Sequence, residues 1–478
     1  MKNSNNSKLP DKIIVPEIFS NGNIVREKKI YHIKNWINGR IKTDLDIENN
    51  GFEGEGFVIN KNGEPVIYNE NLFIGLPETD KDIKKVSTNP DSENNLNKEI
   101  RNFLGNGLFY EKKVNITREL YLPCIETSFN KGYNIKELFI KIIQSYKELI
   151  SFIESKNLLY TPLGNMPLYT KNIPNFGNNY YKYLFETRDG LDIAYFRGAG
   201  FQLHKGIENY KLAVYTYNKI RHLLPLFLVL SENSPFVDNE YRGNLSERTS
   251  TKCDWKMTGI PDAIDNNFLN HLQDWLNSTI KSVTPYYFAV RYPRIDIKTI
   301  ENCSMDMVSD ILIMCTLIDL YYRITERLKI AFLEKEKLPT KLFGKDNNSF
   351  VETNVIKENF HRSIRYGTNV KYSLLGEKEY SFKEYMDNLL TFIETIPSVF
   401  PEFVSNIFNI TCQDPTKKII GNIIDNGNLA EKTLKDFSLY KKNPINPIKI
   451  NKEDIKKYLI KSAKHFSEQI SKIIINNQ

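Results

Sequence analysis

The chain has 478 residues, a formal net charge of +7, 41% hydrophobic residues and 12% aromatic residues. This apolar content is sufficient for a large buried core, which excludes a wholly disordered chain. Nucleic-acid binders gather basic residues on one face or in a run, whereas the lysines here are dispersed along the sequence. No stretch reaches the roughly 18 to 20 apolar residues that span a bilayer. We therefore expect neither a nucleic-acid nor a membrane partner.

The cysteines and the first residues indicate the cellular compartment. The five cysteines form no CxxC pair, which argues against a disulfide framework and against a zinc ribbon. The first ten residues are polar, and no apolar core of a signal peptide follows them. We expect a reduced, cytoplasmic protein.

Hydrophobic periodicity predicts strands that alternate with helices of unequal length. In chain order, the expected elements are strands at 51–60 and 116–128, a helix at 135–156, a strand at 195–207, a helix at 210–230, a strand at 289–303, a helix at 306–333 and a mostly helical remainder from 380. A regular βαβ spacing is absent. The pattern favours an α+β fold.

Two of the predicted strands carry pairs of carboxylates. Glu53 and Glu55 lie two positions apart and therefore share one strand face. Such a pair repels unless protons or a cation intervene, and oxygen ligands suit Mg²⁺. Taken alone, the pair is better explained by a solvated strand face. Glu119 and Glu126 are seven apart and fall on opposite faces unless a bulge at Pro123 turns both inward.

The two later strands add further polar groups. Gln202 and His204 share a face, although a lone histidine is more often a satisfied core residue than a ligand. Glu301 adds a carboxylate to an otherwise apolar strand. Polar groups that several strands contribute to one sheet face would be costly inside a core. Together, these coincidences favour a metal site built on a sheet.

Two segments carry arginines suited to bind anions. Arg242 and Arg248 lie in SENSPFVDNEYRGNLSERTS, and Arg362 and Arg365 lie in ENFHRSIRYGTN. Arginine binds carboxylate or phosphate oxygens in a bidentate manner, while surface ion pairing is the alternative for each. Neither GxxxxGK[ST] nor GxGxxG occurs, so a P-loop or Rossmann nucleotide site is not expected.

The order of these motifs resembles the glutamate–cysteine ligase family 2, the carboxylate–amine ligases, over roughly residues 45–395. The segments that carry the resemblance are GFEGEGF at 51–57 (GxExE in the family), CIETS at 124–128, GFQLHKGI at 200–207 (HVHVG), LPLFLVLSENSPFVDNEYRGNLSERT at 224–249, GIP at 259–261, TIE at 299–301 (TxExR) and ENFHRSIRYG at 358–367 (ENrwrAaRYG). No single motif is decisive, but seven in the correct order make chance a poor explanation.

The resemblance implies an antiparallel, funnel-like sheet backed by helices, as in the catalytic domain of glutamine synthetase and the guanido kinases. Together with the composition, it predicts three regions: a polar N-terminal arm over 1–30, a catalytic domain over 31–440 and a C-terminal helical extension over 441–478, with the arm and the extension exceeding a minimal family member. The implied activity is ATP-dependent amide formation through an acyl phosphate, with ATP and Mg²⁺ (or Mn²⁺) as cofactors. The expected substrates are the γ-carboxylate of glutamate and cysteine or another amine.

The resemblance also assigns roles to individual residues. The implied metal ligands are Glu53, Glu55, Glu126, Gln202 and Glu301, with Glu119 as a weaker candidate. The implied contacts to nucleotide phosphate or substrate carboxylate are Arg248, Arg362 and Arg365, with Arg291 or Arg294 in place of the arginine of the family's WDIRP segment. Arg248, Arg365 and Glu301 are the implied catalytic residues.

Several positions depart from the family pattern. Gln202 replaces the first histidine of HVHVG, Cys303 replaces the arginine of TxExR, and Asn165 stands in GNMP where the family has the histidine of GTHP. These departures leave two alternatives open. One is the same chemistry on another acid, or on a carrier-bound acid, in specialised-metabolite biosynthesis. The other is a non-catalytic descendant that serves as a binding subunit. Exposed helix faces near the C-terminus leave room for a homodimer.

Overall fold

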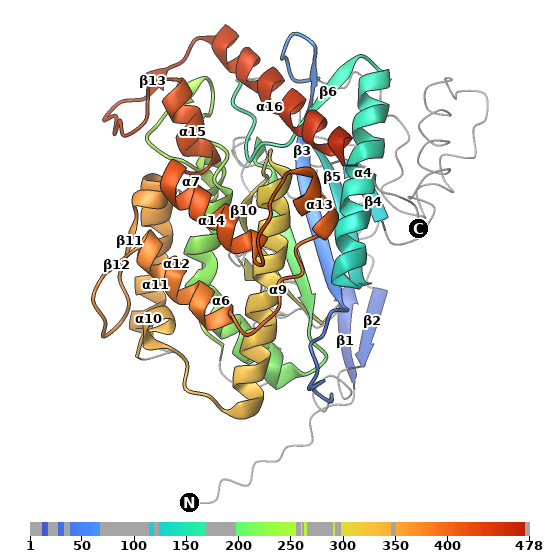
Figure 1. The fold of residues 1–478 in the computed structure, drawn as a ribbon, viewed down its shortest axis with the longest axis vertical. Helices are drawn as coiled ribbons and strands as arrows, with labels where there is room; N and C mark the ends of the chain where they lie inside the picture. Colours follow the sequence, from blue (N-terminus) through green and yellow to red (C-terminus); the bar gives the residue numbers. More distant parts are fainter. Residues whose placement is uncertain are drawn as a thin grey trace, which may run out of the picture.

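The computed structural model describes the following residues: 12–17, 27–32, 39–66, 114–118, 124–168, 197–254, 260, 262–264, 290–291, 298–345 and 350–473. A seven-stranded sheet lies at the centre of the described part (Figure 1). Its strands are β3 (Asn50–Asn60), β4 (Val114–Arg118), β5 (Cys124–Tyr133), β6 (Leu158–Thr161), β7 (Gly200–Gly206), β9 (Val290–Arg291) and β10 (Thr299–Asp306). Their order is β4–β5–β3–β7–β10–β9, and β6 also pairs with β3. Every one of these pairings is antiparallel.

Helices cover one face of this sheet (Figure 1). The covering helices are α4 (Ile135–Ser155), α6 (Tyr210–Ser231), α9 (Ile311–Glu334) and α16 (Lys452–Lys472). The rings of Phe52 on β3 and Phe201 on β7 pack edge to face with centroids 5.1 Å apart. A side chain at Gly54 would place its Cβ 2.4 Å from the hydroxyl of Tyr146 on α4. The glycine is therefore needed for the close approach of helix and sheet.

The remaining elements surround this core. They are β1 (Lys12–Glu17), β2 (Glu27–His32), β8 (Glu240–Tyr241), α7 (Glu247–Asp254), α10 (Thr340–Phe343), α11 (Phe350–Tyr366), η4 (Gly367–Asn369), β11 (Lys371–Tyr372), β12 (Tyr380–Ser381), α12 (Phe382–Ile393), α13 (Glu402–Ile407), α14 (Pro415–Asn426), α15 (Leu429–Asp436) and β13 (Ile448–Lys449). Strands β1 and β2 pair within the segment expected to be a polar arm. The α+β class is confirmed.

Several sequence predictions agree with the structure, and three need correction. The strand at 51–60 and the helices at 135–156 and 210–230 are confirmed as β3, α4 and α6. The run 116–128 is divided between two antiparallel strands, β4 and β5, and the run 289–303 is divided between β9 and β10. Apolar strand runs carry no signal of where the chain reverses direction.

The third correction concerns the start of the long helix α9. The sequence analysis began it at Asp306, but that residue ends β10 and is fully buried. The helix begins after Asp310, whose side chain accepts hydrogen bonds from the backbone N–H groups of Leu312 (2.8 Å) and Ile313 (3.2 Å). Aspartate is a favoured N-cap because its carboxylate satisfies the unpaired N–H groups of the first turn.

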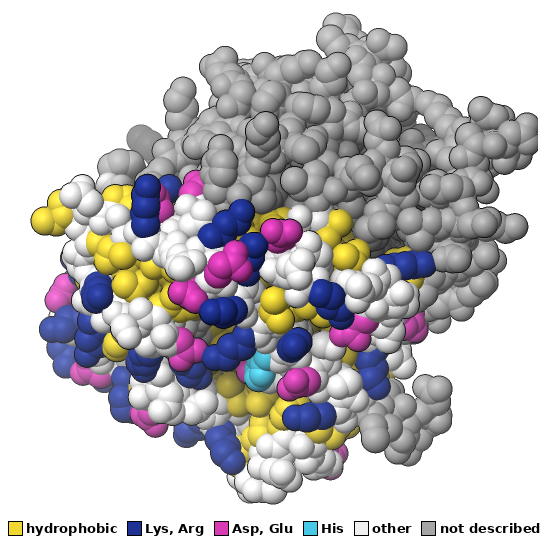
Figure 2. All heavy atoms as spheres, turned by 90° about the horizontal axis from the view of Figure 1, so that it is seen from above, with side chains coloured by type: hydrophobic (Ala, Val, Ile, Leu, Met, Phe, Trp, Pro, Cys, Tyr) yellow, Lys and Arg dark blue, Asp and Glu magenta, His cyan; other side chains and the backbone are white. Residues whose placement is uncertain are grey.

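The outer surface is mixed in charge. Seen from above, its described part carries lysine and arginine interspersed with aspartate and glutamate (Figure 2). Among the described helices, none combines the length and the apolar character needed to cross a membrane.

Candidate metal and phosphate site

The register of the strands places the predicted polar residues on one face of the sheet. Directly paired residues of antiparallel strands share a face. Glu55 pairs with Glu126 of β5, and Glu53 pairs with Gln202 of β7. Glu301 of β10 pairs with His204 of β7. Four adjacent strands thus contribute to one polar surface on the face opposite Phe52 and Phe201.

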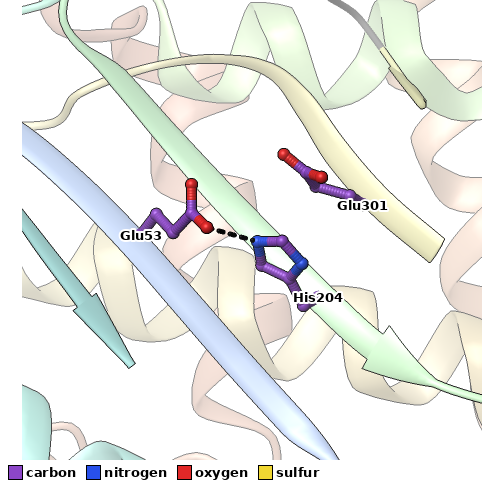
Figure 3. Close-up of side chains that lie close together, drawn as sticks. All are labelled: Glu53, His204 and Glu301. Atoms are coloured by element: carbon purple, nitrogen blue, oxygen red, sulfur yellow. Dashed lines mark ion pairs between the residues drawn. The ribbon is translucent and has the colours of Figure 1, made fainter. Parts of the chain in front are cut away.

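Three of these side chains converge closely (Figure 3). Glu53, His204 and Glu301 each offer one ligand atom, and these three atoms lie within 4.8 Å of one another. The Nε2 atom of His204 lies 3.2 Å from Oε1 of Glu53. His204 and Glu301 are 6% and 0% exposed. Two carboxylates and an imidazole at this spacing form a donor set that fits a divalent cation.

Gln202 lies between the carboxylates. Its Nε2 atom donates to Oε1 of Glu55 at 3.3 Å. The other end of the amide lies 2.8 Å from Oε1 of Glu301 and 3.3 Å from Oε2 of Glu53. If the amide oxygen faces the two carboxylates, three oxygens meet there, and a cation between them satisfies all three. If the amide is rotated so that its NH₂ group faces them, that group donates a hydrogen bond to both carboxylates. In either orientation, Gln202 belongs to the cluster.

Arg248 lies beside the same cluster and is 3% exposed. Its Nη2 donates to the carbonyl of Cys303 at 3.3 Å, and the Cys303 thiol donates to Oε1 of Glu301 at 3.1 Å. Nε and Nη1 of Arg248 have no hydrogen-bond partner among the described residues. A buried guanidinium with spare donors suits a phosphate or carboxylate oxygen.

Two glycines make room for this arginine. A Cβ at Gly200 would lie 2.4 Å from Nη2 of Arg248, and a Cβ at Gly198 would lie 2.9 Å from its Cγ. The backbone N–H of Gly200 also donates to Oε2 of Glu55 at 2.5 Å. The RGAGF segment therefore brings the arginine and the carboxylates together.

Asp306 fixes the loop from which Arg248 extends. Its carboxylate accepts hydrogen bonds from the hydroxyls of Ser234 (2.6 Å) and Ser246 (2.8 Å) and from the backbone N–H of Asn233 (3.0 Å). Burial raises the pKa of Asp306, and the charge of Arg248 opposes that shift. The two serines of the SENSPF…SER signature thus have a structural role, because they anchor the loop to the end of β10.

The structure does not bring the second arginine signature to this cluster within the described residues. Arg362 forms surface ion pairs with Glu358 and Glu379, each at 2.9 Å. Arg365 is exposed at the end of α11. It lines a surface cavity of about 270 Å³, together with Tyr366 and Glu431, and none of the polar sheet residues lines that cavity.

The structure describes only some of the other predicted site residues. Glu126 is half-buried on β5, next to Glu55. The backbone of Arg291 pairs with Glu301, which puts this position on the polar face. Its side chain, Glu119 and Arg294 lie outside the described residues.

Two residues of the site had no predicted role. His204 was counted with Gln202 among the polar groups of the sheet face but was not among the expected ligands, yet it belongs to the closest part of the cluster. Its shared face with Gln202 was the available signal. Asp306 was assigned to a helix and received no role; only the strand register reveals its contacts.

An antiparallel sheet that presents carboxylates and an imidazole on one face, with the buried Arg248 of α7 beside them, forms a donor set that fits a divalent cation and an anionic group. The chain belongs to the glutamate–cysteine ligase family 2, whose model matches residues 51–294, just over half of the chain.

Two curated relatives, each provisionally named glutamate–cysteine ligase 2, are similar to the chain. The protein of Solibacter usitatus is 26% identical over 247 residues, which cover 50% of this chain and 57% of that protein. The protein of Rhodopirellula baltica is 24% identical over 224 residues, which cover 45% of this chain and 58% of that protein. The match therefore spans little more than half the length of these relatives.

Among solved structures, the complex of the prokaryotic ubiquitin-like protein Pup with its ligase PafA is similar at 11% sequence identity and a TM-score of 0.39. That comparison covers 87% of this chain and 72% of the other. The score is too low to establish a shared fold.

Proposed function

We propose that this protein is an ATP- and divalent-metal-dependent carboxylate–amine ligase, which forms an amide bond through an acyl phosphate. The observation that carries the proposal is the convergence of Glu53, His204 and Glu301 from three strands, with the spare donors of Arg248 beside them. Family membership supports the same chemistry.

Each part of the site has a role in this proposal. Mg²⁺ or Mn²⁺, when bound, neutralises the triphosphate and the charge that develops on the transferred phosphoryl group. Glu53, His204, Gln202 and Glu301 would hold the cation, and Glu55 and Glu126 would extend the acidic surface along β3 and β5. Arg248 binds a phosphate or substrate carboxylate oxygen through Nε and Nη1.

The remaining predicted contacts have unequal support. The position of Arg291 next to Glu301 keeps it a candidate for phosphate binding, and Arg294 follows it in sequence. Arg362 is engaged by two surface glutamates, so we assign it no contact with the nucleotide. The exposed position of Arg365 gives no support to a catalytic role.

The proposed acid is glutamate, activated at its γ-carboxylate, and the proposed amine is cysteine or another small amine. The replacements at Gln202 and Cys303 alter the surroundings of the cluster and motivate a second candidate, the same reaction on another acid or on a carrier-bound acid. A cytoplasmic location and a homodimer stay predictions.

The experiment is a measurement of ADP release with Mg-ATP, glutamate and a panel of amines. Stimulation that requires both the acid and an amine supports the proposal, and its absence with every acid and amine refutes turnover. Glu301→Gln should abolish the stimulation because it removes a ligand charge. Glu394→Gln, the same change at an exposed position, is the matched control and should behave as wild type.

Calorimetry with Mg-ATP, combined with the ADP-release assay, distinguishes the ligase from a non-catalytic descendant. A catalytic protein and a binding subunit both bind the nucleotide in a metal-dependent manner, but only the ligase releases ADP when acid and amine are added. Binding of ATP without any turnover would favour the non-catalytic binding subunit over the ligase.

A further inference from the structure

Strand β10 is irregular where it passes the cluster. Asn302 pairs with Leu203 and Met305 pairs with Phe201, so the register shifts between them. Cys303 and Ser304 therefore face the single residue Gln202. Two residues opposite one is the pattern of a β-bulge, which occurs beside active sites and turns a side chain in a new direction.

Hydrogen bonds hold this bulge in place. The side-chain oxygen of Asn302 accepts from the backbone N–H of Ser304 at 3.1 Å and from its hydroxyl at 2.7 Å. The carbonyl of Cys303 accepts from Nη2 of Arg248 at 3.3 Å. These hydrogen bonds hold the backbone at Cys303 and at the residues on either side of it.

The bulge places the Cys303 side chain against Glu301 of the cluster. Its sulfur lies 3.1 Å from Oε1 of Glu301, and the residue is 5% exposed. The same Oε1 atom lies 2.8 Å from the amide of Gln202. One carboxylate oxygen is thus in contact with both an amide and a sulfur.

These distances are close to those between two ligands of one ion. With metal–oxygen and metal–sulfur bonds of about 2.1 and 2.3 Å, the two ligand atoms lie about 3.1 Å apart at a right angle and about 3.6 Å apart at a tetrahedral angle. The observed sulfur–oxygen distance of 3.1 Å falls at the lower end of this range.

We propose that Cys303 is a sulfur ligand, with Glu301 and Gln202, of a divalent cation of the zinc or cobalt type, at a position adjacent to Glu53 and His204. The inference rests on the proposed metal site and extends it. Sulfur ligands select zinc-like ions, whereas sites with only oxygen ligands suit Mg²⁺. The TxExR pattern has an arginine at this position, so a sulfur donor here is a property of this chain.

The test is a titration with Co²⁺, because a cobalt–sulfur bond produces a charge-transfer absorption in the near ultraviolet. The exposed Cys412 is first replaced by serine, which removes an accessible thiol from the background. In that full-length protein we expect a saturable band, at one equivalent of Co²⁺, that Zn²⁺ abolishes.

Two further variants separate coordination from general effects. Cys303→Ser should lose the band and bind Zn²⁺ at least tenfold more weakly. Cys315→Ala changes another buried cysteine, on α9, and should keep the band. Thermal unfolding of each variant verifies that it is folded.

The outcomes separate this inference from the proposed function. A band that persists in Cys303→Ser, or the lack of any band in a protein that binds Mg-ATP, overturns the inference and leaves the ligase proposal intact. If neither Co²⁺ nor Mg-ATP binds, both proposals fail.

Discussion

Gly200→Ala tests the position of Arg248 with the smallest possible change. An added Cβ would lie 2.4 Å from Nη2 of the arginine, whereas ordinary contacts begin at 3.4 Å. The guanidinium must therefore move by about 1 Å, because the strand backbone at Gly200 is held in the sheet. The hydrogen bond from Nη2 to the carbonyl of Cys303, now 3.3 Å, does not survive such a shift.

The expected magnitude follows from that bond. A hydrogen bond that involves a charged group contributes about 1.5 to 3 kcal/mol, so we expect the free energy of unfolding to fall by about 2 kcal/mol. If the same guanidinium holds a phosphate, the loss of a comparable contact weakens the binding of Mg-ATP by about 10- to 100-fold. Urea unfolding measures the first effect, and calorimetry measures the second.

Gly421→Ala is the matched control. Gly421 lies within α14, and an added Cβ there has nothing within 4 Å. Alanine is favoured over glycine inside a helix by roughly 0.5 to 1 kcal/mol, so this variant should be slightly more stable and bind Mg-ATP normally. A folded Gly200→Ala protein that binds Mg-ATP as tightly as wild type would refute the role of Arg248 in phosphate binding.

Three further variants test buried polar groups of the fold. Asp306→Ala leaves two buried serine hydroxyls and a backbone N–H unpaired, which should lower the free energy of unfolding in urea by about 3 to 5 kcal/mol; a loss below about 1 kcal/mol would contradict the anchoring role. Burial, reinforced by the negative charge of nearby Glu431, raises the pKa of Glu232 well above its usual value. The protonated Glu232 side chain therefore contributes fully to stability below the unfolded-state pKa, and this contribution is lost as the pH rises through the folded-state pKa. Relative to Glu232→Gln, the wild type should lose stability as the pH rises above the ordinary glutamate value of 4.5, as followed by urea unfolding, and parallel curves would argue against this effect. Lys205→Met removes a buried ammonium that donates to backbone carbonyls of the 44–50 segment and pairs with Glu326 at 3.4 Å, so limited proteolysis should cleave that segment sooner.

The elements that could be predicted from the sequence are those with a strong local signal. The i, i+3, i+4 spacing of apolar residues determined the helices at 135–155 and 210–231, because each packs a broad apolar surface against the sheet. The divisions of the runs at 116–128 and 289–303 depended instead on pairing between strands. A strand segment can continue or reverse with the same local composition, so only tertiary contacts distinguish the two.

The candidate site shows the same division between local and tertiary information. The shared face of Glu53 and Glu55 follows from alternation along one strand, and it was predicted. Alternation does not reveal which strands are neighbours in the sheet. The pairing of β10 with β7 places Glu301 opposite His204. For Arg362, the order of motifs gave no information about the acidic partners on the surface.

The departures from the family pattern become intelligible only in three dimensions. Gln202 and Cys303 lie on different strands, yet both contact the same oxygen of Glu301, at 2.8 and 3.1 Å. The replacement of an imidazole by an amide and the replacement of a guanidinium by a thiol therefore affect one location. An arginine beside Glu301 would neutralise that carboxylate, whereas an amide and a thiol leave its charge available to a cation. If Glu53, His204 and Glu301 hold a cation as proposed, the two replacements together favour that coordination over an ion pair at Glu301.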